Sequence, residues 1–313
     1  MAATATRRRL TEVERAARVE ALTAELAAAV QALTDSAGWR SMLEVSARFR
    51  RYSLNNQLLL WAQGTERGTT LSRVAAFGTW RKLGYRVRAG EKGLRIFGPV
   101  TRRLRADEVA SWLAQGRDPF DPDGRPRLVV RGFTVEYVFD LSQVDPGPDA
   151  QPLPENRTWI AQRGDGPAGL WPALLALTEA HGFTLDVRPA RPADGGAHGW
   201  TDYATRTVWV NSDCDEAERV RILAHETAGH IRCDHEHRRD ISRGQRETEA
   251  DSVAYVVLAA LGLDISSSTV EYLADWSRGD TDLLRAAAET VHRVAAAVLA
   301  DLDHCDQPRE TAA

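Results

Sequence analysis

The chain has 313 residues, of which 43% are hydrophobic and 27% charged, so its composition is that of a globular protein and excludes a disordered one. Its apolar runs are too short to span a bilayer, and no apolar segment of a secretory signal follows the arginines near residue 8. Three cysteines form no disulfide framework. These features predict a cytoplasmic protein with no membrane partner.

The net charge of −4 hides a strong asymmetry along the chain. Residues 1–105 contain 20 Lys and Arg but only 8 Asp and Glu, a net charge of +12, whereas the rest has 20 basic and 36 acidic residues, or −16. A cationic segment favours a polyanionic partner such as nucleic acid. The alternative is an ordinary solvated surface in an arginine-rich protein.

The first half of the chain changes texture near residue 69. Before it, leucines at helical spacing predict an amphipathic helix over 10–35 and a second helix over about 39–63. After it, short apolar segments alternate with Gly-marked turns, which predicts strands and hairpins, with a loop at 118–127. Four prolines in residues 144–156 indicate a linker between domains.

The second half mixes helices with short strands. The predicted elements are a helix over 171–182, a strand over 184–189, a Gly-rich turn leading into a strand over 206–210, a helix reaching at least Ile231, a helix over 246–262 and two more helices at the C-terminus. Together with the first half, this pattern predicts an α+β fold in two domains.

The stretch LAHETAGH, residues 223–230, contains most of a zinc-protease motif. In H-E-x-x-H two histidines one helical turn apart share a zinc ion, and the glutamate beside the first takes a proton from the zinc-bound water. His225 and Glu226 fit this pattern, but Gly229 stands where the second histidine belongs and His230 follows it.

The extra residue poses a geometric problem. In an ideal α-helix, residues five apart lie about 140° from alignment, so His225 and His230 could not bind one ion. One π-turn, with its i→i+5 hydrogen bond, would restore the alignment, and Gly229 would ease the distortion. Other donors stay open, namely the i+4 series Glu226, His230 and Asp234 and the nearby Cys233, His235 and His237. The remaining alternative is a surface helix with incidental histidines.

A third ligand is expected from the helix that follows. Its first turns, in the stretch RETEADSVAYVV, contain Glu247, Glu249 and Asp251 ahead of an apolar segment. The alternative is that these carboxylates only complement the helix dipole.

Two resemblances follow from these residues. LAHETAGH, with the preceding GGAHGWTDYATRTVWVNS and the following ETEADSVAYVV, resembles the ImmA/IrrE-type metallopeptidases. The resemblance implies a zincin-like fold that binds Zn²⁺ through His225, His230 and Glu249, with Glu247 as the alternative third ligand. It also implies Glu226 as the catalytic base.

The front of the chain resembles the N-terminal single-stranded-DNA-binding domain of ArdC-type antirestriction proteins. The matching stretches are 49–63, 74–100 and 137–145. ArdC-type proteins join this domain to a zincin-like metallopeptidase domain. The resemblance therefore implies a basic, helix-plus-antiparallel-sheet nucleic-acid-binding domain over 1–145, a linker over 146–158, and a metallopeptidase domain with C-terminal helices over 159–313.

Three groups of side chains in this front segment suit a single strand. The cations that would neutralise phosphates are Arg50, Arg51, Lys82, Arg86, Arg88, Lys92 and Arg95. The rings that would stack on bases are Tyr52, Trp80, Tyr85 and Phe97; the alternative is core packing, which is favoured for Trp80 and Phe97. The uncharged polar groups that would contact bases or sugars are Asn55, Asn56 and Gln57.

The leading hypothesis is thus a single-stranded-DNA-binding protein with a zinc metallopeptidase-like domain, related to antirestriction and to plasmids or other mobile elements, with a possible protein substrate. One alternative is a non-catalytic DNA-protection protein whose zincin domain is a scaffold. Another is a regulator that acts by cleaving a repressor.

Overall fold

The structure is a computed structural model that describes residues 11–34, 36–153, 169–263, 277 and 279–305. The chain divides into two compact units, of which unit 1 comprises Met1–Ala28 and Thr69–Ala150, and unit 2 comprises Ala29–Gly68 and Gln151–Ala313. Both units combine helices with a small sheet, so the predicted α+β class is confirmed. None of the described helices is long and apolar enough to cross a membrane.

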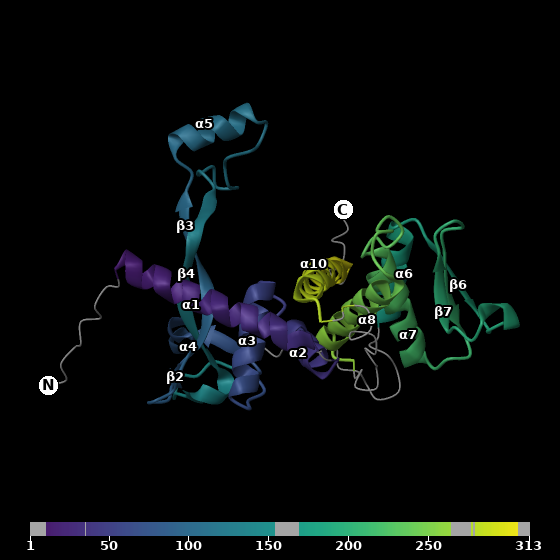
Figure 1. Cartoon of the computed structure of the whole chain (residues 1–313), viewed down its shortest axis with the longest axis horizontal. Helices are drawn as coiled ribbons and strands as arrows, with labels where there is room; N and C mark the ends of the chain where they lie inside the picture. Colours follow the sequence, from purple (N-terminus) through teal and green to yellow (C-terminus); the bar gives the residue numbers. More distant parts are fainter. Residues whose placement is uncertain (1–10, 35, 154–168, 264–276, 278, 306–313) are drawn as a thin grey trace, which may run out of the picture. The chain divides into compact units, whose positions relative to one another are not determined.

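Unit 1 is built around an antiparallel sheet in the order β1-β4-β3, with β2 and β5 paired separately. Strands β3 and β4 form a long ribbon that ends in α5 (Figure 1). Its elements are most of α1 (Glu12–Gln31), β1 (Val74–Ala76), α4 (Phe77–Lys82), β2 (Tyr85–Val87), β3 (Leu94–Arg103), α5 (Ala106–Ala114), β4 (Leu128–Asp140), the short 3-10 helix η2 (Leu141–Gln143) and β5 (Val144–Pro146).

One face of the unit 1 sheet is its core. Leu94 and Ile96 alternate on β3, and Val138 lies opposite Leu94 on β4; all three are buried. The buried carboxylate of Asp140 accepts hydrogen bonds from the backbone N–H groups of Ser72, Arg73 and Ser142. These bonds fix the entry to β1 and the end of β4, so the sheet is tied together where its strands begin and end.

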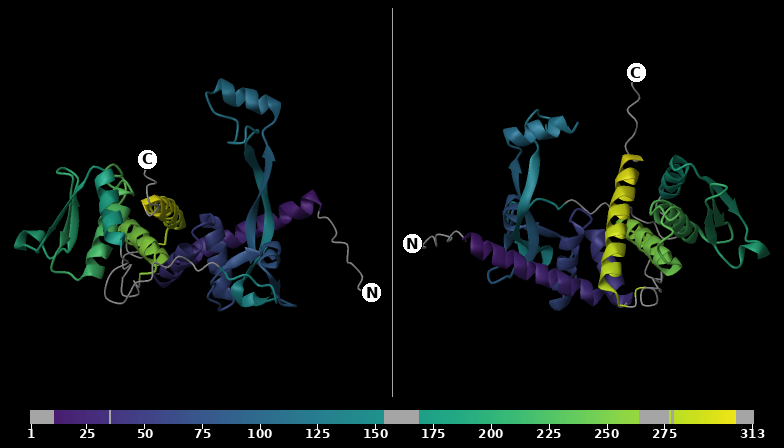
Figure 2. Two further views of the ribbon diagram at one scale, coloured as in Figure 1. Left: turned by 180° about the vertical axis from the view of Figure 1, so that it is seen from behind. Right: turned by 45° about the horizontal axis from the view of Figure 1, so that its top comes forward.

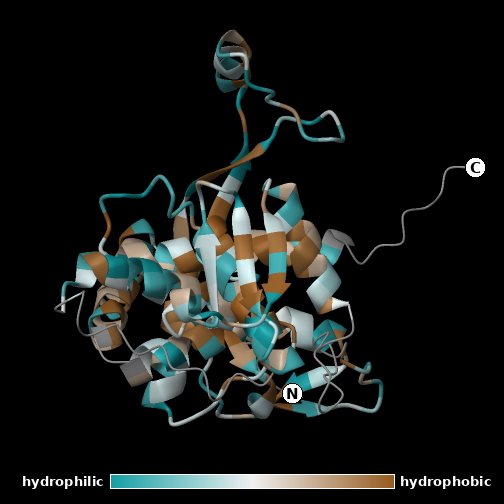
Figure 3. Cartoon of the chain, turned by 90° about the vertical axis from the view of Figure 1, so that its right-hand side faces the viewer, coloured by the Kyte–Doolittle hydropathy of each residue, from teal (hydrophilic) through white to brown (hydrophobic). Residues whose placement is uncertain are grey.

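Unit 2 has a mixed sheet in the order β6-β8-β7, with β6 parallel and β7 antiparallel to the central β8. This sheet faces the viewer in Figure 3, where apolar stretches run through its strands. The elements of the unit are the short 3-10 helix η1 (Ala32–Thr34), α2 (Ser36–Arg48), α3 (Leu54–Glu66), α6 (Leu170–Ala180), β6 (Thr184–Arg188), the 3-10 helix η3 (Pro192–Asp194), β7 (Gly199–Asp202), β8 (Thr207–Asn211), α7 (Glu216–Ala224), the π-helix η4 (His225–Ile231), α8 (Arg243–Ala260) and α10 (Thr281–Cys305).

Helix α8 lies at the centre of unit 2. Its residues 252–258 are all buried, and α10 runs beside it (Figure 2). Helix α2 also packs against α8, since the fully buried Trp39 donates a hydrogen bond of 2.9 Å from Nε1 to Ser252 Oγ. The segment Ala29–Gly68 therefore shares its core with the C-terminal half of the chain, although the sequence assigned it to the front domain.

The predicted single helix over 39–63 is wrong, because the chain leaves the helix between α2 and α3. The side chain of Gln57 donates from Nε2 to the carbonyl oxygens of Phe49 (3.1 Å) and Tyr52 (3.0 Å), and so satisfies two acceptors that the break exposes. Helix α5 and strand β7 also lie where the sequence predicted strands and a turn, respectively.

Unit 1 ends at Ala150, close to the predicted boundary after residue 145. Residues 154–158 of the predicted linker lie outside the described residues, as does most of the chain between α8 and α10.

Replacing Trp39 with Ala should destabilise unit 2 by about 3–5 kcal/mol, because it removes a fully buried ring and leaves a cavity between α2 and α8. Denaturant unfolding followed by circular dichroism measures the effect. Leu283→Ala, at a side chain that is 40% exposed on α10, is the control and should change little. An equally small effect of Trp39→Ala would contradict the packing of α2 on α8.

Candidate metal centre

The motif helix changes from α to π at His225. Helix α7 ends at Ala224, and η4 continues it as a π-helix over His225–Ile231. The N–H of Arg232 donates to the carbonyl oxygen of Thr227 at 3.1 Å, an i→i+5 bond. As a result the imidazole rings of His225 and His230 lie 4.7 Å apart between centroids. The π-turn, which the sequence offered as one way to align the two histidines, is present.

Gly229 allows this segment to lie directly on α8. A Cβ atom at position 229 would lie only 2.7 Å from both Cα and Cβ of Ala250 and 2.8 Å from its carbonyl oxygen. Since neither backbone could give way easily, only glycine fits at this contact. The close approach brings the two histidines to the first turns of α8.

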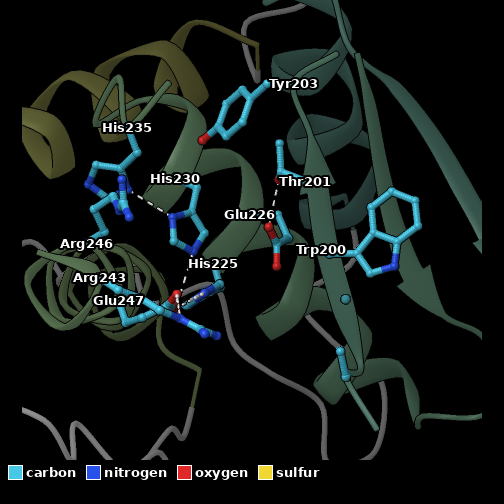
Figure 4. A pocket seen from close by; sticks show the side chains of 12 residues that line it. Trp200, Thr201, Tyr203, His225, Glu226, His230, His235, Arg243, Arg246 and Glu247 are labelled. Carbon is cyan, nitrogen blue, oxygen red and sulfur yellow. Dashed lines mark hydrogen bonds and ion pairs between the residues drawn. The ribbon is translucent and has the colours of Figure 1, made fainter. Parts of the chain in front are cut away.

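Of the two candidate third ligands, Glu247 is the one beside the histidines. Its Oε2 atom lies 3.7 Å from Nε2 of His225 and 3.5 Å from Nε2 of His230. Glu249 is two residues further on, about 200° around the helix, and faces away from the pair. The structure therefore does not bring Glu249 to the histidines, and the alternative, Glu247, takes that place (Figure 4).

Glu249 instead forms the end of a buried polar chain. Its fully buried carboxylate accepts hydrogen bonds from Arg238, from Gln245 Nε2 at 3.0 Å and from His235 Nε2 at 3.1 Å. His235 Nδ1 in turn lies 2.9 Å from Nδ1 of His230. Glu249 thus reaches the site through His235.

These contacts determine the tautomer of His230. A carboxylate only accepts, so Nε2 of His235 must carry the proton that bonds Glu249. Burial lowers the pKa of His235, which keeps the ring neutral and leaves its Nδ1 as an acceptor. The Nδ1–H of His230 therefore donates to it, and Nε2 of His230 is the atom that faces Glu247.

Asp251 orients the ring of His225 in the same way that His235 orients the ring of His230. Its Oδ1 accepts from Nδ1 of His225 at 2.7 Å, so Nε2 of His225 is the atom that faces the cavity. A partner on the far nitrogen of each histidine is the usual arrangement around a protein-bound metal ion. From the sequence, Asp251 and His235 were expected only as candidate ligands.

Charge is strongly coupled in this cluster. Burial lowers the pKa of His225, but hydrogen bonds to Asp251 and Glu247 outweigh it and raise the pKa to about 10. Hydrogen bonds to His225 and His230 hold the pKa of Glu247 well below its usual range. The carboxylates of this cluster therefore carry negative charge, which is compensated by the positive charge of protonated His225. A bound metal cation could compensate the same charge.

The donor set fits a divalent metal ion. Two ligands about 2.0–2.1 Å from a tetrahedral ion lie roughly 3.4 Å apart, close to the separations of Glu247 from the two Nε2 atoms. The three candidate ligand atoms all lie within 4.8 Å of one another.

The second buried group, Cys233, His235 and Glu249, also has metal-binding side chains. There the Arg238 guanidinium already compensates the carboxylate, which makes this group a poor cation site. Asp234, the other open alternative, pairs with His237 at the surface instead of facing His230.

The three candidate ligands border a cavity of about 400 Å³ in unit 2. The buried Glu226 also lines this cavity and accepts a hydrogen bond of 2.7 Å at Oε2 from the hydroxyl of Thr201 on β7. Tyr203 lines the cavity on the side of His230 (Figure 4), and its hydroxyl is buried with no hydrogen-bond partner among the described residues. Burial raises the pKa of Tyr203, so the hydroxyl is a neutral donor.

Sequence reasoning missed Thr201 and Tyr203, since nothing in the sequence shows that β7 runs beside η4. Asp251 carried a usable signal, because it lies four residues after Glu247 and so on the same helical face.

The predicted nucleic-acid-binding residues do not form one set. Residues 50–57 belong to unit 2 and residues 80–95 to unit 1. Asn56, Gln57 and Trp80 are buried, and the Trp80 Nε1 donates to the carbonyl oxygen of Phe139 at 2.8 Å, so these three side chains are part of the core. Asn55 accepts a hydrogen bond from Arg285, and Arg50 pairs with Asp303 at 3.5 Å.

The other predicted residues lie nearer the surface. Arg88 pairs with Glu91 and Asp145, and Arg95 with Glu25. Tyr52, Tyr85 and Phe97 are half-buried, and the exposed side chains are those of Arg51, Lys82, Arg86, Arg88 and Lys92.

Comparison with known proteins supports the resemblance at the front of the chain. Residues 16–135 match the family model of the N-terminal domain of the anti-restriction factor ArdC. An uncharacterized Bacillus anthracis protein is 22% identical over 269 residues, which cover 77% of this chain and 44% of the relative. The chain thus spans less than half the length of that relative.

Two crystal structures of the antirestriction ArdC protein from plasmid R388 are also similar. The Mn(II)-bound form is 19% identical with a TM-score of 0.50, covering 92% of this chain and 98% of the other. The metal-free form is 21% identical with a TM-score of 0.47, covering 81% and 86%. The match to the Mn(II)-bound form shows a shared fold.

Gly229→Ala should destabilise unit 2 by about 1–3 kcal/mol, because the added methyl group collides with the backbone of α8. It should also weaken divalent-metal binding, since it moves the histidines away from Glu247. Denaturant unfolding and isothermal titration calorimetry measure the two effects. Gly132→Ala, where an added Cβ meets nothing within 4 Å, is the control. Unchanged stability and affinity in Gly229→Ala would refute this account of η4.

Proposed function

We propose that this chain is an ArdC-like antirestriction protein that carries a metal-dependent peptidase site in unit 2 and binds single-stranded DNA through unit 1. The observation that supports the metal site most is the π-helix, which brings His225 and His230 to Glu247 in spite of the extra residue in the motif. The link to mobile elements is proposed from the similarity to the plasmid R388 protein.

His225, His230 and Glu247 would hold the ion. A divalent cation supplies Lewis acidity, which acidifies water and polarises a carbonyl group. Zn²⁺ is the ion that the sequence predicts, and the plasmid R388 protein was crystallised with Mn(II), so both ions belong in the test.

Glu226 is the proposed general base. The hydroxyl of Thr201 donates a hydrogen bond to Oε2 of Glu226 and so orients the carboxylate. The other oxygen, Oε1, would then take a proton from the attacking water. The Cα of Gly199 borders the same space, since a Cβ there would lie 3.6 Å from Oε1. The Tyr203 hydroxyl is suited to donate a hydrogen bond to the oxygen on which negative charge develops.

The position of β7 favours a peptide as substrate. It is an edge strand of the sheet, and its residues Gly199 and Thr201 line the cavity with Glu226. An extended peptide can add to such an edge through main-chain hydrogen bonds, which would lay a scissile bond along the cavity.

Single-stranded DNA binding is proposed from the match of residues 16–135 to the ArdC N-terminal domain family, together with the exposed cations of unit 1. Among the predicted residues, these are Lys82, Arg86, Arg88 and Lys92. A DNA-protection protein with a scaffold domain, and a regulator that cleaves a repressor, are rival forms of the same proposal that the experiments below separate.

His225→Ala, His230→Ala and Glu247→Gln should each abolish stoichiometric binding of Zn²⁺ or Mn²⁺, because each removes a proposed ligand. Asp251→Asn should cost only about 10–100-fold in affinity, as expected for an outer partner. Calorimetry on the chelator-treated protein gives the affinities. Full binding by Glu247→Gln, with loss in Glu249→Gln, would exchange the roles assigned to these two residues.

Glu226→Gln should retain the metal and lose peptide cleavage, because it removes the base and leaves the ligands intact. Hydrolysis of unfolded casein, with the metal content of each sample measured, checks this. A casein-cleaving wild type that is matched by Glu226→Gln would exclude Glu226 as the base. Metal binding without cleavage of casein or of co-expressed repressors would favour the scaffold form of the proposal.

Affinity for oligo(dT) should fall steeply as salt rises, with a logarithmic slope of about −0.7 per phosphate contacted. Fluorescence anisotropy at several salt concentrations measures it, with a duplex of equal length as the competitor. Absence of oligo(dT) binding even at low salt would eliminate the DNA-binding half of the proposal.

A further inference from the structure

One face of the unit 1 sheet carries a row of aromatic rings whose grouping the sequence did not reveal. Phe133, Tyr137 and Phe139 stand on the same face of β4, because they are separated by even numbers of residues. Phe97 on β3 and Phe77 at the start of α4 extend the row, with ring centroids 6.0 Å from Phe133 and 6.5 Å from Phe139, respectively. We call these five residues the aromatic stripe.

The stripe is not core. Phe77 and Phe133 are each 56% exposed and Tyr137 is 41% exposed, whereas Leu94, Ile96 and Val138 fill the core on the opposite face. Neighbouring large rings left this open to water usually mark a binding surface. Gly93 preserves the opening, since a Cβ there would lie 3.1 Å from Tyr137 Cβ and 3.2 Å from Phe139 Cζ.

Charge on the two faces of the ribbon is segregated. Arg95 lies opposite Tyr137 in the strand register, on the face of the stripe, and Arg131 borders a groove with Phe133. The carboxylates of β4, Glu136 and Asp140, alternate onto the other face.

The acids near these cations come from helices, and Glu12 and Glu20 of α1 line the groove with Arg131. Glu25 pairs with Arg95 at 2.8 Å, and Glu108 lies 3.6 Å from Arg131. Both arginines are more than 40% exposed, and phosphates can compete for such solvent-exposed pairs.

From this arrangement we infer that the aromatic stripe is the base-stacking surface for single-stranded DNA, with Arg95 and Arg131 contacting the backbone; the inference rests on the proposed DNA binding. Rings two residues apart on a strand are about 6.6–6.8 Å apart, a spacing that lets successive unstacked bases each find a ring. A duplex keeps its bases stacked inside and offers no such faces. Trp80, which the sequence suggested as a stacking ring, is buried, so in this inference the aromatic stripe provides the stacking surface instead.

The test measures anisotropy of labelled oligo(dT) with the full-length chain. Phe133→Ala and Tyr137→Ala should each weaken binding by about 5- to 150-fold, as for loss of one stacked base, while Tyr137→Phe retains wild-type affinity. Phe120→Ala removes a 36% exposed ring outside the stripe and should bind normally. The ring variants should keep the wild-type salt slope, because rings release no counterions. Thermal unfolding of each variant verifies that the substitutions leave the fold intact.

The outcomes are distinct. If wild type binds oligo(dT) and the ring variants bind equally well, the stripe is excluded while DNA binding stands. If wild type does not bind, the proposed DNA binding fails and the stripe with it. Tighter binding of oligo(U) than of oligo(dT), or a stripe-dependent dimer that does not bind DNA, would also overturn the inference.

Discussion

The candidate metal centre depends on one backbone irregularity, the π-helix His225–Ile231. A regular α-helix would send His225 and His230 to different sides, and π-helical turns are rare and occur mostly at functional sites. Such a segment persists only where its surroundings determine it. Here the backbone of Gly229 packs directly against Ala250. Hydrogen bonds to Asp251 and His235 orient the imidazole rings of His225 and His230, respectively. The π-helix is thus stabilised by α8 and by the loop that contains His235, and the contacts that pack η4 on α8 also assemble the site.

The acidic start of α8 serves two faces of the helix at once. Glu247 and Asp251, one turn apart, face His225, while Glu249 faces the interior and binds Arg238, Gln245 and His235. Burial raises the pKa of Glu249, but these partners outweigh it and hold the carboxylate ionised. Removing one partner from such a buried group typically costs about 3–5 kcal/mol. Glu249 therefore supports His230 from behind without being available to an ion.

The roles of Glu247 and Glu249 show which features of the site could be predicted from the sequence. Residue spacing was enough to show that His225 and His230 could share an ion only through a π-turn, because that argument involves only the helix itself. Choosing between Glu247 and Glu249 required the rotation of α8 about its axis, which is set by long-range packing on Gly229 and Trp39. Burial of Gln57 also had no local signal, since its role is to satisfy carbonyl groups exposed by a helix break that the apolar pattern did not reveal. The sequence was thus sufficient for arguments within one helix, but not for the rotation of one helix relative to its neighbours.

Charge along the sequence was a weaker guide than it first seemed. Residues 1–105 have a net charge of +12, but unit 1 contains 19 basic and 14 acidic residues, a net charge of only +5. The difference arises because residues 29–68 belong to unit 2 and because acidic residues after position 105 belong to unit 1. Several of these acids pair with its arginines, including Glu108 with Arg102, Asp121 with Arg103 and Asp118 with Arg127. With so much charge compensated internally, electrostatic attraction alone would give weak, nonspecific contact. On the proposed DNA binding, preference for a single strand would come from groups that recognise unpaired bases, and in unit 1 the aromatic stripe supplies exposed rings of that kind.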